Sequence, residues 1–278
     1  MADTRAGVAL MRGWSLEAAH PTDPEIQQLR AIAPAGTHVY VPAVPRQPAA
    51  RLAEAAAKLR AAGFEPVPHI AARDYADAAQ LGDVLRQADV RRALIVAGDR
   101  DQPAGPFGDA RAVIESGLLQ RHGIAHIGIS GYPDGHPRIA PDVLDRALSE
   151  KLAAAEHAGL GVSIVSQFCF EPERILAWLQ RLRAAGIALP VRIGIAGPTS
   201  VAGLLRYAAR CGVRASARGL TRHAGSLRGL LGHAAPDDLL AALADAQMRD
   251  GLGDVSPHFF SFGGVVATAS YARAAATC

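Results

Sequence analysis

The segment Ile129-Ser-Gly-Tyr-Pro-Asp-Gly-His-Pro-Arg138 ends an apolar run, residues 124–129, with a short polar turn. The apolar run indicates a buried strand, so Tyr132, Asp134 and His136 follow the C-terminal end of that strand. Tyr-Pro-Asp-Gly is also good turn chemistry, because proline restricts φ and glycine tolerates positive φ. The segment by itself therefore leaves two interpretations open, a simple turn and a functional site.

Eight short apolar runs, this one included, alternate with longer helical patterns along almost the whole chain. This alternation is typical of βα units and a parallel sheet. We predict strands at 13–18, 37–42, 66–71, 93–97, 125–129, 162–167, 191–195 and 257–262. We predict helices at 49–62, 74–86, 142–157, 172–185 and 201–211, several of which end near a glycine.

The chain has 278 residues, close to the roughly 250 residues of a (β/α)8 barrel. An open doubly wound sheet would normally carry a glycine-rich phosphate turn, and the sequence contains neither GxGxxG nor GxxxxGK[ST]. We therefore predict a single α/β domain, a (β/α)8 TIM barrel that spans residues 1–278. Glycines and a proline interrupt residues 214–250, where we predict a mobile loop over the site and two short helices.

Composition excludes several classes of protein. Half of the residues are apolar, enough for a large core, and the net charge is only +3 without a run of like charges, so a nucleic-acid surface is not expected. Three separated cysteines, Cys169, Cys211 and Cys278, provide neither a disulfide framework nor a CxxC metal pair. The N-terminus lacks an apolar leader, and no run reaches the ~18 apolar residues of a membrane helix. We expect a cytoplasmic protein without a membrane span.

Polar residues follow several of the predicted strands. Because the carboxyl ends of barrel strands converge on one mouth, we expect these side chains to form a common site. Each also has a simple structural interpretation: a buried core histidine, a brace for a turn, a helix cap or an exposed charge. The candidates are Glu17, His69, Asp99, Tyr132, His136 and Gln167.

In order and spacing, these strand ends resemble the methylenetetrahydrofolate reductase family over nearly the whole chain. The similarity is strongest in four motifs: Pro68-His-Ile70, Gly98-Asp99, Gly131-Tyr-Pro-Asp-Gly-His-Pro137 and Ser166-Gln-Phe-Cys-Phe-Glu171. The resemblance implies that FAD lies across the barrel mouth, takes a hydride from NAD(P)H and passes it to 5,10-methylenetetrahydrofolate. It implies a small-molecule folate partner, and it leaves a homo-oligomer open.

The resemblance also implies a role for each motif. Glu17 is expected to be the general acid, with partial burial beside Trp14 and Leu16 making the acid form available. Asp99 is expected to face both flavin and pterin, and Gln167 to bind the pterin edge through its amide. Phe260 stands where the family has a substrate-binding tyrosine. The FAD contacts implied by the resemblance are His69, Gly98, Asp99, Tyr132, His136 and Lys151.

The sequence departs from the family pattern mainly where FAD phosphates would bind. Ala97 replaces an expected arginine, and the helix around residues 148–156 offers Lys151 and alanines in place of several polar groups. The C-terminal motif, 259–264, lacks a substrate-binding tyrosine and arginine. Because charge-assisted hydrogen bonds to phosphate are lost, weaker FAD binding is expected. Other cations could replace them: Arg46, Arg73 and Arg138.

Three alternatives follow. NAD(P)H could transfer its hydride directly to the folate without a flavin. The protein could also be a folate-binding relative that no longer catalyses the reaction. A metal-dependent hydrolase would use His69, Asp99 and His136 as ligands, although the leading interpretation requires no metal.

Overall fold

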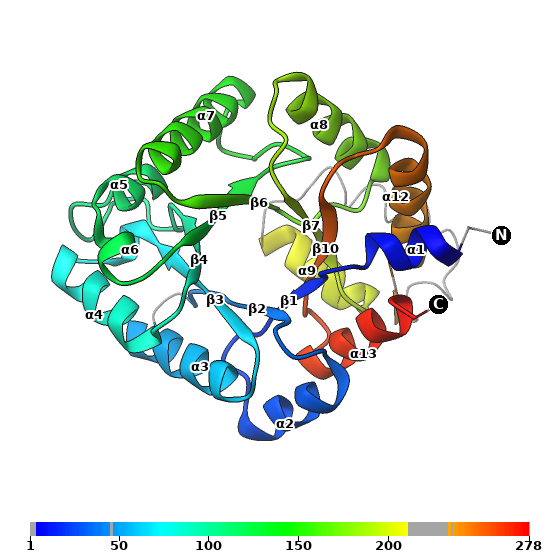
Figure 1. Cartoon of the computed structure of the whole chain (residues 1–278), viewed down its shortest axis with the longest axis horizontal. Helices are drawn as coiled ribbons and strands as arrows, with labels where there is room; N and C mark the ends of the chain where they lie inside the picture. Colours follow the sequence, from blue (N-terminus) through cyan, green and yellow to red (C-terminus); the bar gives the residue numbers. More distant parts are fainter. Residues whose placement is uncertain (1–3, 45–46, 211–232, 235, 278) are drawn as a thin grey trace.

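The computed structural model describes residues 4–44, 47–210, 233–234 and 236–277. Eight parallel strands form a closed barrel in the order β1-β10-β7-β6-β5-β4-β3-β2 (Figure 1). This confirms the predicted (β/α)8 fold, and each strand lies within a few residues of its predicted position. The strands are β1 Ser15–Glu17, β2 His38–Val41, β3 Glu65–Ala71, β4 Arg92–Val96, β5 His126–Gly131, β6 Gly161–Ser166, β7 Val191–Ala196 and β10 Val255–Phe260.

A ring of helices surrounds the barrel (Figure 1). Its members are α2 Asp23–Ile32, α3 Ala49–Ala61, α4 Ala78–Ala88, α5 Ala110–Glu115, α6 Leu118–Arg121, α7 Pro141–His157, α8 Pro172–Ala184, α12 Asp237–Asp250 and α13 Val265–Ala275. The short α1 (Thr4–Leu10) packs against α12, and a 3-10 turn, Ala72–Asp74, follows β3. Within the described residues, no helix is long and apolar enough to cross a membrane.

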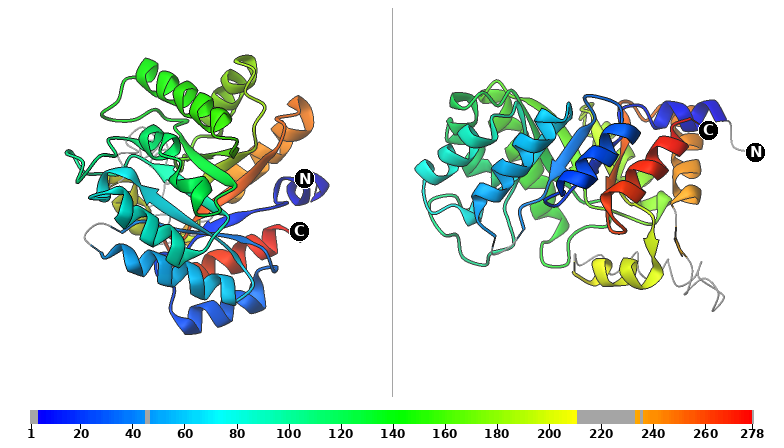
Figure 2. Two further views of the ribbon diagram at one scale, coloured as in Figure 1. Left: turned by 60° about the vertical axis from the view of Figure 1, so that its left-hand side comes forward. Right: turned by 90° about the horizontal axis from the view of Figure 1, so that it is seen from below.

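Helix α9 (Val201–Arg210) lies outside this ring. It follows β7, and in the right-hand view of Figure 2 it lies below the barrel, on the side to which the carboxyl ends of the strands point. The two-residue strands β8 (Thr199–Ser200) and β9 (His233–Ala234) pair antiparallel beside it. The carboxyl end of the barrel therefore carries an additional structural layer.

The prediction for residues 214–250 is tested only in part. The described portion holds one continuous helix, α12, because the chain has no breaker between Asp237 and the left-handed Gly251 that ends it. The predicted mobile loop and two short helices fall mainly on residues 214–232, which lie outside the described residues.

Strand alternation separates two apolar regions. Leu16, Val39, Ile70 and Ile95 face the helices and are fully buried in the main core. Their neighbours along the strands face the barrel interior, where Tyr40, Val67, Leu94 and Val165 form a second, smaller cluster. The interior is thus filled by side chains below the mouth.

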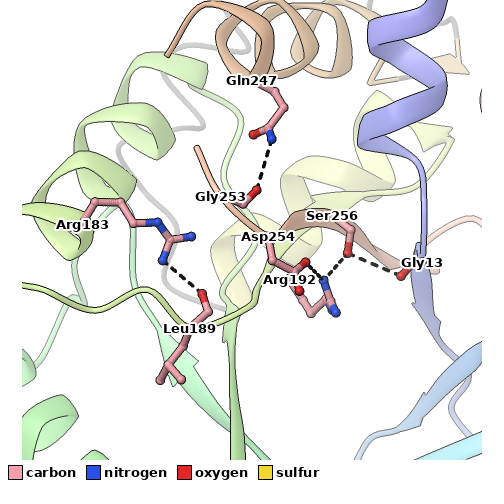
Figure 3. A network of polar contacts seen from close by, with 8 residues as sticks. All are labelled: Gly13, Arg183, Leu189, Arg192, Gln247, Gly253, Asp254 and Ser256. Carbon is pink, nitrogen blue, oxygen red and sulfur yellow. Dashed lines mark hydrogen bonds and ion pairs between the residues drawn. The ribbon is translucent and has the colours of Figure 1, made fainter. Parts of the chain in front are cut away.

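Polar contacts fasten the amino-terminal end of the barrel where β10 meets β7 and β1 (Figure 3). Arg192 Nη1 donates hydrogen bonds to Asp254 Oδ1 at 3.0 Å and to Ser256 Oγ at 2.8 Å. Ser256 Oγ in turn donates to the Gly13 carbonyl, at 3.4 Å. This network joins the first and last parts of the barrel and fixes β10 beside β1.

Candidate active site

Glu17 ends β1 with its carboxyl group inside the barrel. Its Oε1 lies 3.7 Å from His69 Nε2 of β3 and 3.8 Å from His258 Nε2 of β10. The Glu17 side chain is 16% exposed, so it is a lining group and not a rim charge. The expectation that Glu17 is buried beside Trp14 and Leu16 was wrong. Side chains alternate along the strand, so both residues lie on the face opposite Glu17, in the main core.

His258 is a component of this site that the sequence analysis did not identify. It is fully buried, and its Nδ1 is 2.9 Å from the hydroxyl of Ser15. A signal was available, since Pro257-His258 in the last strand repeats the Pro68-His69 pair of β3. Its proximity to Glu17 depends on the pairing of β10 with β1.

Tyr40 lies between the two imidazoles and completes this group. Its ring meets that of His258 edge-on with centroids 4.4 Å apart and that of His69 at 6.0 Å. Burial raises the pKa of Tyr40 to about 12, and burial lowers the pKa of His69 to about 4 despite the nearby Glu17 carboxylate. At neutral pH, Glu17 therefore faces an uncharged phenol and an uncharged His69.

Both imidazoles direct an unsatisfied atom at Glu17. Within the described structure, neither His69 Nε2 nor His258 Nε2 has a hydrogen-bond partner. A buried polar atom without a partner costs about 1–3 kcal/mol. The distances to Glu17 are longer than a hydrogen bond, as is common for catalytic groups without ligand.

The chain bends sharply after β4, at Gly98 and Asp99. Gly98 has φ +91°, and a Cβ there would lie 3.2 Å from the Cβ of Ala71 on β3, so the bend requires glycine. Asp99 is exposed next to it. Its charge acts on His136 and on Asp74, which places Asp99 near the loop that follows β5.

The segment after β5 is both a turn and a wall of the mouth. Gly135 N donates to the Tyr132 carbonyl at 3.1 Å, which closes a turn with Pro133 at its second position. The Tyr132 hydroxyl donates to Ser130 Oγ at 3.3 Å, and its ring meets that of His136 edge-on at 5.5 Å. Burial and Arg138 lower the pKa of His136.

The loop after β6 crosses β7 at Gly194, where hydrogen bonds hold it in place. Gln167 N donates to the Gly131 carbonyl at 2.8 Å, and Gly194 N donates to Ser166 Oγ at 2.8 Å. A Cβ at Gly194 would lie 2.4 Å from the Ser166 carbonyl oxygen, so this crossing has room only for glycine. The Gln167 amide oxygen accepts from Phe168 N at 3.1 Å.

Aromatic rings form one side of the mouth. Phe260 at the end of β10 meets His258 and Phe168 edge-on, with centroids 5.3 and 5.2 Å apart. Phe262 follows it, and Tyr207 of α9 stacks on Phe262 at 4.1 Å with the two rings 10° from parallel. Phe260, Phe262 and Tyr207 are partly buried around the fully buried Phe168, and together they offer an apolar wall to a planar ligand.

Lys151 lies apart from these groups. It is buried on α7, in the outer ring of helices, where burial lowers its pKa to about 8 although the Asp109 carboxylate opposes this change. Of the other cations, Arg73 donates to the carbonyls of Gly108 and Arg100. Arg138 is exposed beside Asp101 at 3.5 Å, and Arg46 lies outside the described residues.

These positions test the fit of FAD. The glycine bend at Gly98 and the Tyr132–His136 pair could border a flavin ring. Of the described cations expected to replace the lost phosphate ligands, Arg73 donates to backbone carbonyls, Arg138 is paired with Asp101 and Lys151 is withdrawn into the helix layer. These described residues therefore do not fit the diphosphate. A metal site has no better support, because no three His, Cys, Asp or Glu side chains among the described residues could hold an ion.

Comparisons with known sequences all point to one protein family. A family model described as methylenetetrahydrofolate reductase matches residues 25–220. Methylenetetrahydrofolate reductase 2 of Saccharomyces cerevisiae is 34% identical over 82 residues, and methylenetetrahydrofolate reductase 1 of Schizosaccharomyces pombe is 36% identical over 70 residues. These matches cover 30% and 25% of this chain but only 13% and 11% of the two yeast proteins.

Solved structures share the fold over nearly the whole chain. Dihydropteroate synthase from Thermus thermophilus has a TM-score of 0.52 and 17% identity, and the match covers 94% of this chain and 91% of that one. An uncharacterized Clostridium thermocellum protein that binds two copies of 5-methyl-5,6,7,8-tetrahydrofolic acid has a TM-score of 0.58 and 9% identity, with 95% and 93% covered. At these identities the likeness is one of fold.

Proposed function

Because the chain belongs to the methylenetetrahydrofolate reductase family, we propose that it reduces 5,10-methylenetetrahydrofolate to 5-methyltetrahydrofolate with NAD(P)H. The observation that carries this proposal is the Glu17 carboxyl group inside the barrel mouth, 3.7 and 3.8 Å from two imidazoles. A ring-opening reduction needs one acid at such a place. The folate bound by the Clostridium thermocellum neighbour is consistent with a folate at the mouth of this fold.

The reaction adds one proton and one hydride to the folate. Glu17 donates the proton to the ring nitrogen that leaves the methylene carbon, and the five-membered ring opens to an electrophilic iminium. The hydride of NAD(P)H then adds to that carbon and forms the methyl group, while the nicotinamide is oxidised. Glu17 is left as a carboxylate and takes up a proton from solvent before the next turnover.

Three other groups orient the substrate in this proposal. Asp99 supports the positive charge that develops on the folate, because a carboxylate stabilises a nearby cation. The Gln167 amide binds the pterin edge, with its NH2 group as donor. Phe260 packs against the planar ring from the side of β10.

The hydride has two candidate routes. FAD, which would carry the hydride between nicotinamide and folate, stays a prediction from the family resemblance, with His69, Gly98, Asp99, Tyr132, His136 and Lys151 as its candidate contacts. Direct transfer from NAD(P)H is the second candidate. The buried Lys151 and the engaged Arg73 support it, because neither is placed to bind a flavin diphosphate.

A spectrum and an assay together test the function. We expect oxidation of NADH or NADPH that depends on added 5,10-methylenetetrahydrofolate and yields 5-methyltetrahydrofolate in equal amount. A yellow protein that reduced nicotinamide bleaches supports the FAD route, and a colourless active protein supports direct transfer. Tight folate binding without nicotinamide oxidation would contradict a reductase and favour a non-catalytic folate-binding protein.

A single domain over residues 1–278, a cytoplasmic location and a homo-oligomer stay predictions.

A further inference from the structure

We propose that the amino-terminal opening of the barrel, at the end opposite the mouth, binds a small inorganic oxyanion of the class of phosphate and sulfate. Four basic residues lie at the start of four strands there: His38 of β2, Arg92 of β4, His126 of β5 and Arg192 of β7. The proposal does not rest on the proposed function, because it concerns the other end of the barrel and involves no reaction.

Strand alternation turns Arg92 and His126 into the barrel. Arg92 lies two residues before Leu94, which belongs to the interior cluster, so both side chains face the interior. His126 precedes Ile127, which faces the helices in the main core, so the imidazole points inwards. Arg92 and His126 are also register partners on neighbouring strands. A guanidinium and an imidazole therefore lie side by side at this opening.

The next strand, β6, contributes only small residues to this part of the interior. His126 is paired in register with Gly161, where a Cβ would lie 2.6 Å from His126 Nδ1. Ser163 faces the interior as well, because it lies two residues before Val165 of the interior cluster. No bulky side chain of β6 therefore separates an ion from the basic groups of Arg92 and His126.

The two guanidinium groups at this end differ in their partners. Arg192 faces inwards next to Ile193 of the main core, and its Nη1 donates to Asp254 Oδ1 at 3.0 Å and to Ser256 Oγ at 2.8 Å (Figure 3). The half-buried Arg92 has no side-chain hydrogen bond and no ion pair with any residue that the structure describes. Such a guanidinium can bind an oxyanion through two parallel N–H···O bonds.

One unpaired carboxylate faces the same opening and competes with a bound anion. Glu65 of β3 lies two residues before Val67 of the interior cluster, and it is paired in register with His38 of β2. None of the ion pairs between described residues joins Glu65 to Arg92. The Glu65 charge repels an anion across the opening, so its removal should strengthen anion binding.

Both imidazoles add hydrogen-bond donors to this cluster. Burial, together with the charges of Arg92 and Arg192, lowers the pKa values of His38 and His126 to about 4. At neutral pH each imidazole is thus uncharged and offers one N–H. An anion beside them raises both pKa values, so binding takes up protons and strengthens as pH falls. The other ionisable groups that face this end, or lie just above it in the interior, are Glu65, Asp254, Tyr40 and His258.

The test is a titration of the full chain with sodium sulfate, followed by 1H–15N NMR of the His38 and His126 imidazoles. Sulfate is the probe because its charge does not change over the pH range used, and sodium chloride at equal ionic strength is the reference. We expect saturable shifts of both imidazoles with sulfate only, and a Kd at least about threefold lower at about pH 5.5 than at about pH 7.5. Shifts that do not saturate, or that chloride reproduces, overturn the proposal.

Two variants should change sulfate binding in opposite directions. Arg92→Gln removes the guanidinium without a partner and should raise the sulfate Kd at least about tenfold. Arg91→Gln is the matched control, because Arg91 is exposed next to it and the change in net charge is the same; its Kd should change less than about twofold. Glu65→Gln should lower the Kd, because the competing carboxylate is removed.

Equal losses in Arg92→Gln and Arg91→Gln would show that net charge alone attracts sulfate, and this outcome overturns the proposal. An unchanged Kd in a folded Arg92→Gln protein overturns it as well. If Arg92→Gln does not fold, the wild-type titration and Glu65→Gln decide, and a Kd that rises in Glu65→Gln contradicts the site.

Discussion

Glu17 is the residue on which the proposed chemistry depends. Its described ionisable neighbours are a phenol and two imidazoles, and none of the ion pairs among the described residues joins it to a lysine or an arginine.

Glu17→Gln should remove the acid that donates the proton while preserving the shape of the site. We expect folate reduction to fall by roughly 10²–10⁴-fold, because this is the usual contribution of a general acid. If the wild-type protein carries FAD, oxidation of NAD(P)H by an artificial acceptor should persist in this variant. Glu65→Gln, at the amino-terminal start of β3, is the matched control and should keep full activity. Folate turnover by Glu17→Gln at the wild-type rate would assign the proton to another group.

Lys151 presents the opposite case, a buried charge that forms no salt bridge with any described residue. Burial lowers its pKa from 10.5 to about 8, so the folded state disfavours the proton. Lys151→Met should therefore raise the free energy of unfolding by about 1–3 kcal/mol at pH 7. The difference in unfolding free energy between Lys151→Met and the wild type should shrink as pH rises from about 8 to 10.5, because the wild-type lysine loses its proton over this range.

Urea unfolding at pH 7 and at alkaline pH measures this effect. Lys58→Met is the control, since Lys58 is exposed beside Asp23 and Glu54 and should change stability little. A destabilised Lys151→Met protein would contradict the unfavourable burial of this charge. Loss of bound FAD in the variant would show that Lys151 binds the cofactor, as the family resemblance implies.

At the scale of elements, the mouth depends on how strands and loops cross. The β6 strand leaves the sheet after Ser166 and passes over Gly194 of β7, where Cys169 N donates to the Gly194 carbonyl at 3.3 Å. This crossing places Gln167 at the mouth. The glycine is needed for close approach of two backbones, and its φ is not in the left-handed region.

Gly194→Ala should displace the loop that carries Gln167. The added Cβ would lie 2.4 Å from the Ser166 oxygen and 2.7 Å from Phe168 N, and neither backbone atom can move without the loop. We expect a stability loss of about 1–3 kcal/mol and a raised folate Kd by equilibrium titration. Gly7→Ala in α1, where a Cβ meets nothing within 4 Å, is the control. An unchanged folate Kd in Gly194→Ala would mean that Gln167 does not bind the substrate.

At the scale of the whole molecule, the barrel interior contains histidines held neutral in different layers. Burial lowers the pKa values of His38, His69 and His126 to about 4, and Arg92 contributes to the shifts of His38 and His126. Their folded pKa values are below the unfolded value of 6.5, so the unfolded chain binds more protons between these limits.

The protein should therefore lose stability as pH falls from about 6.5 to about 4. Urea midpoints at intervals across this range measure the slope. His126→Gln should flatten it, because this variant removes one group that gains a proton on unfolding. A wild-type midpoint that is constant from neutral to acid pH would contradict the neutral histidines.

Much of the fold could be predicted because its signals are local. Apolar runs, helix periodicity and the glycines that end helices depend on neighbouring residues, so the barrel and its strands followed from the order of the elements. The length of α12 could not be read from the sequence, because the many glycines of residues 214–232 obscured where a continuous helix would begin. Trp14 and Leu16 were misplaced beside Glu17 because sequence proximity was given more weight than strand alternation.

The site could be predicted only in outline. Local patterns were enough to predict the barrel and the carboxyl end at which Glu17, Asp99, Tyr132 and Gln167 lie, because strand direction and strand order are encoded locally. The folded chain was needed to show that His258, 243 residues after Ser15, lies against Ser15 and near Glu17, and that Lys151 is withdrawn into the helix layer. These contacts arise from barrel closure, because the pairing of β10 with β1 brings the two ends of the chain together and no local pattern encodes that pairing.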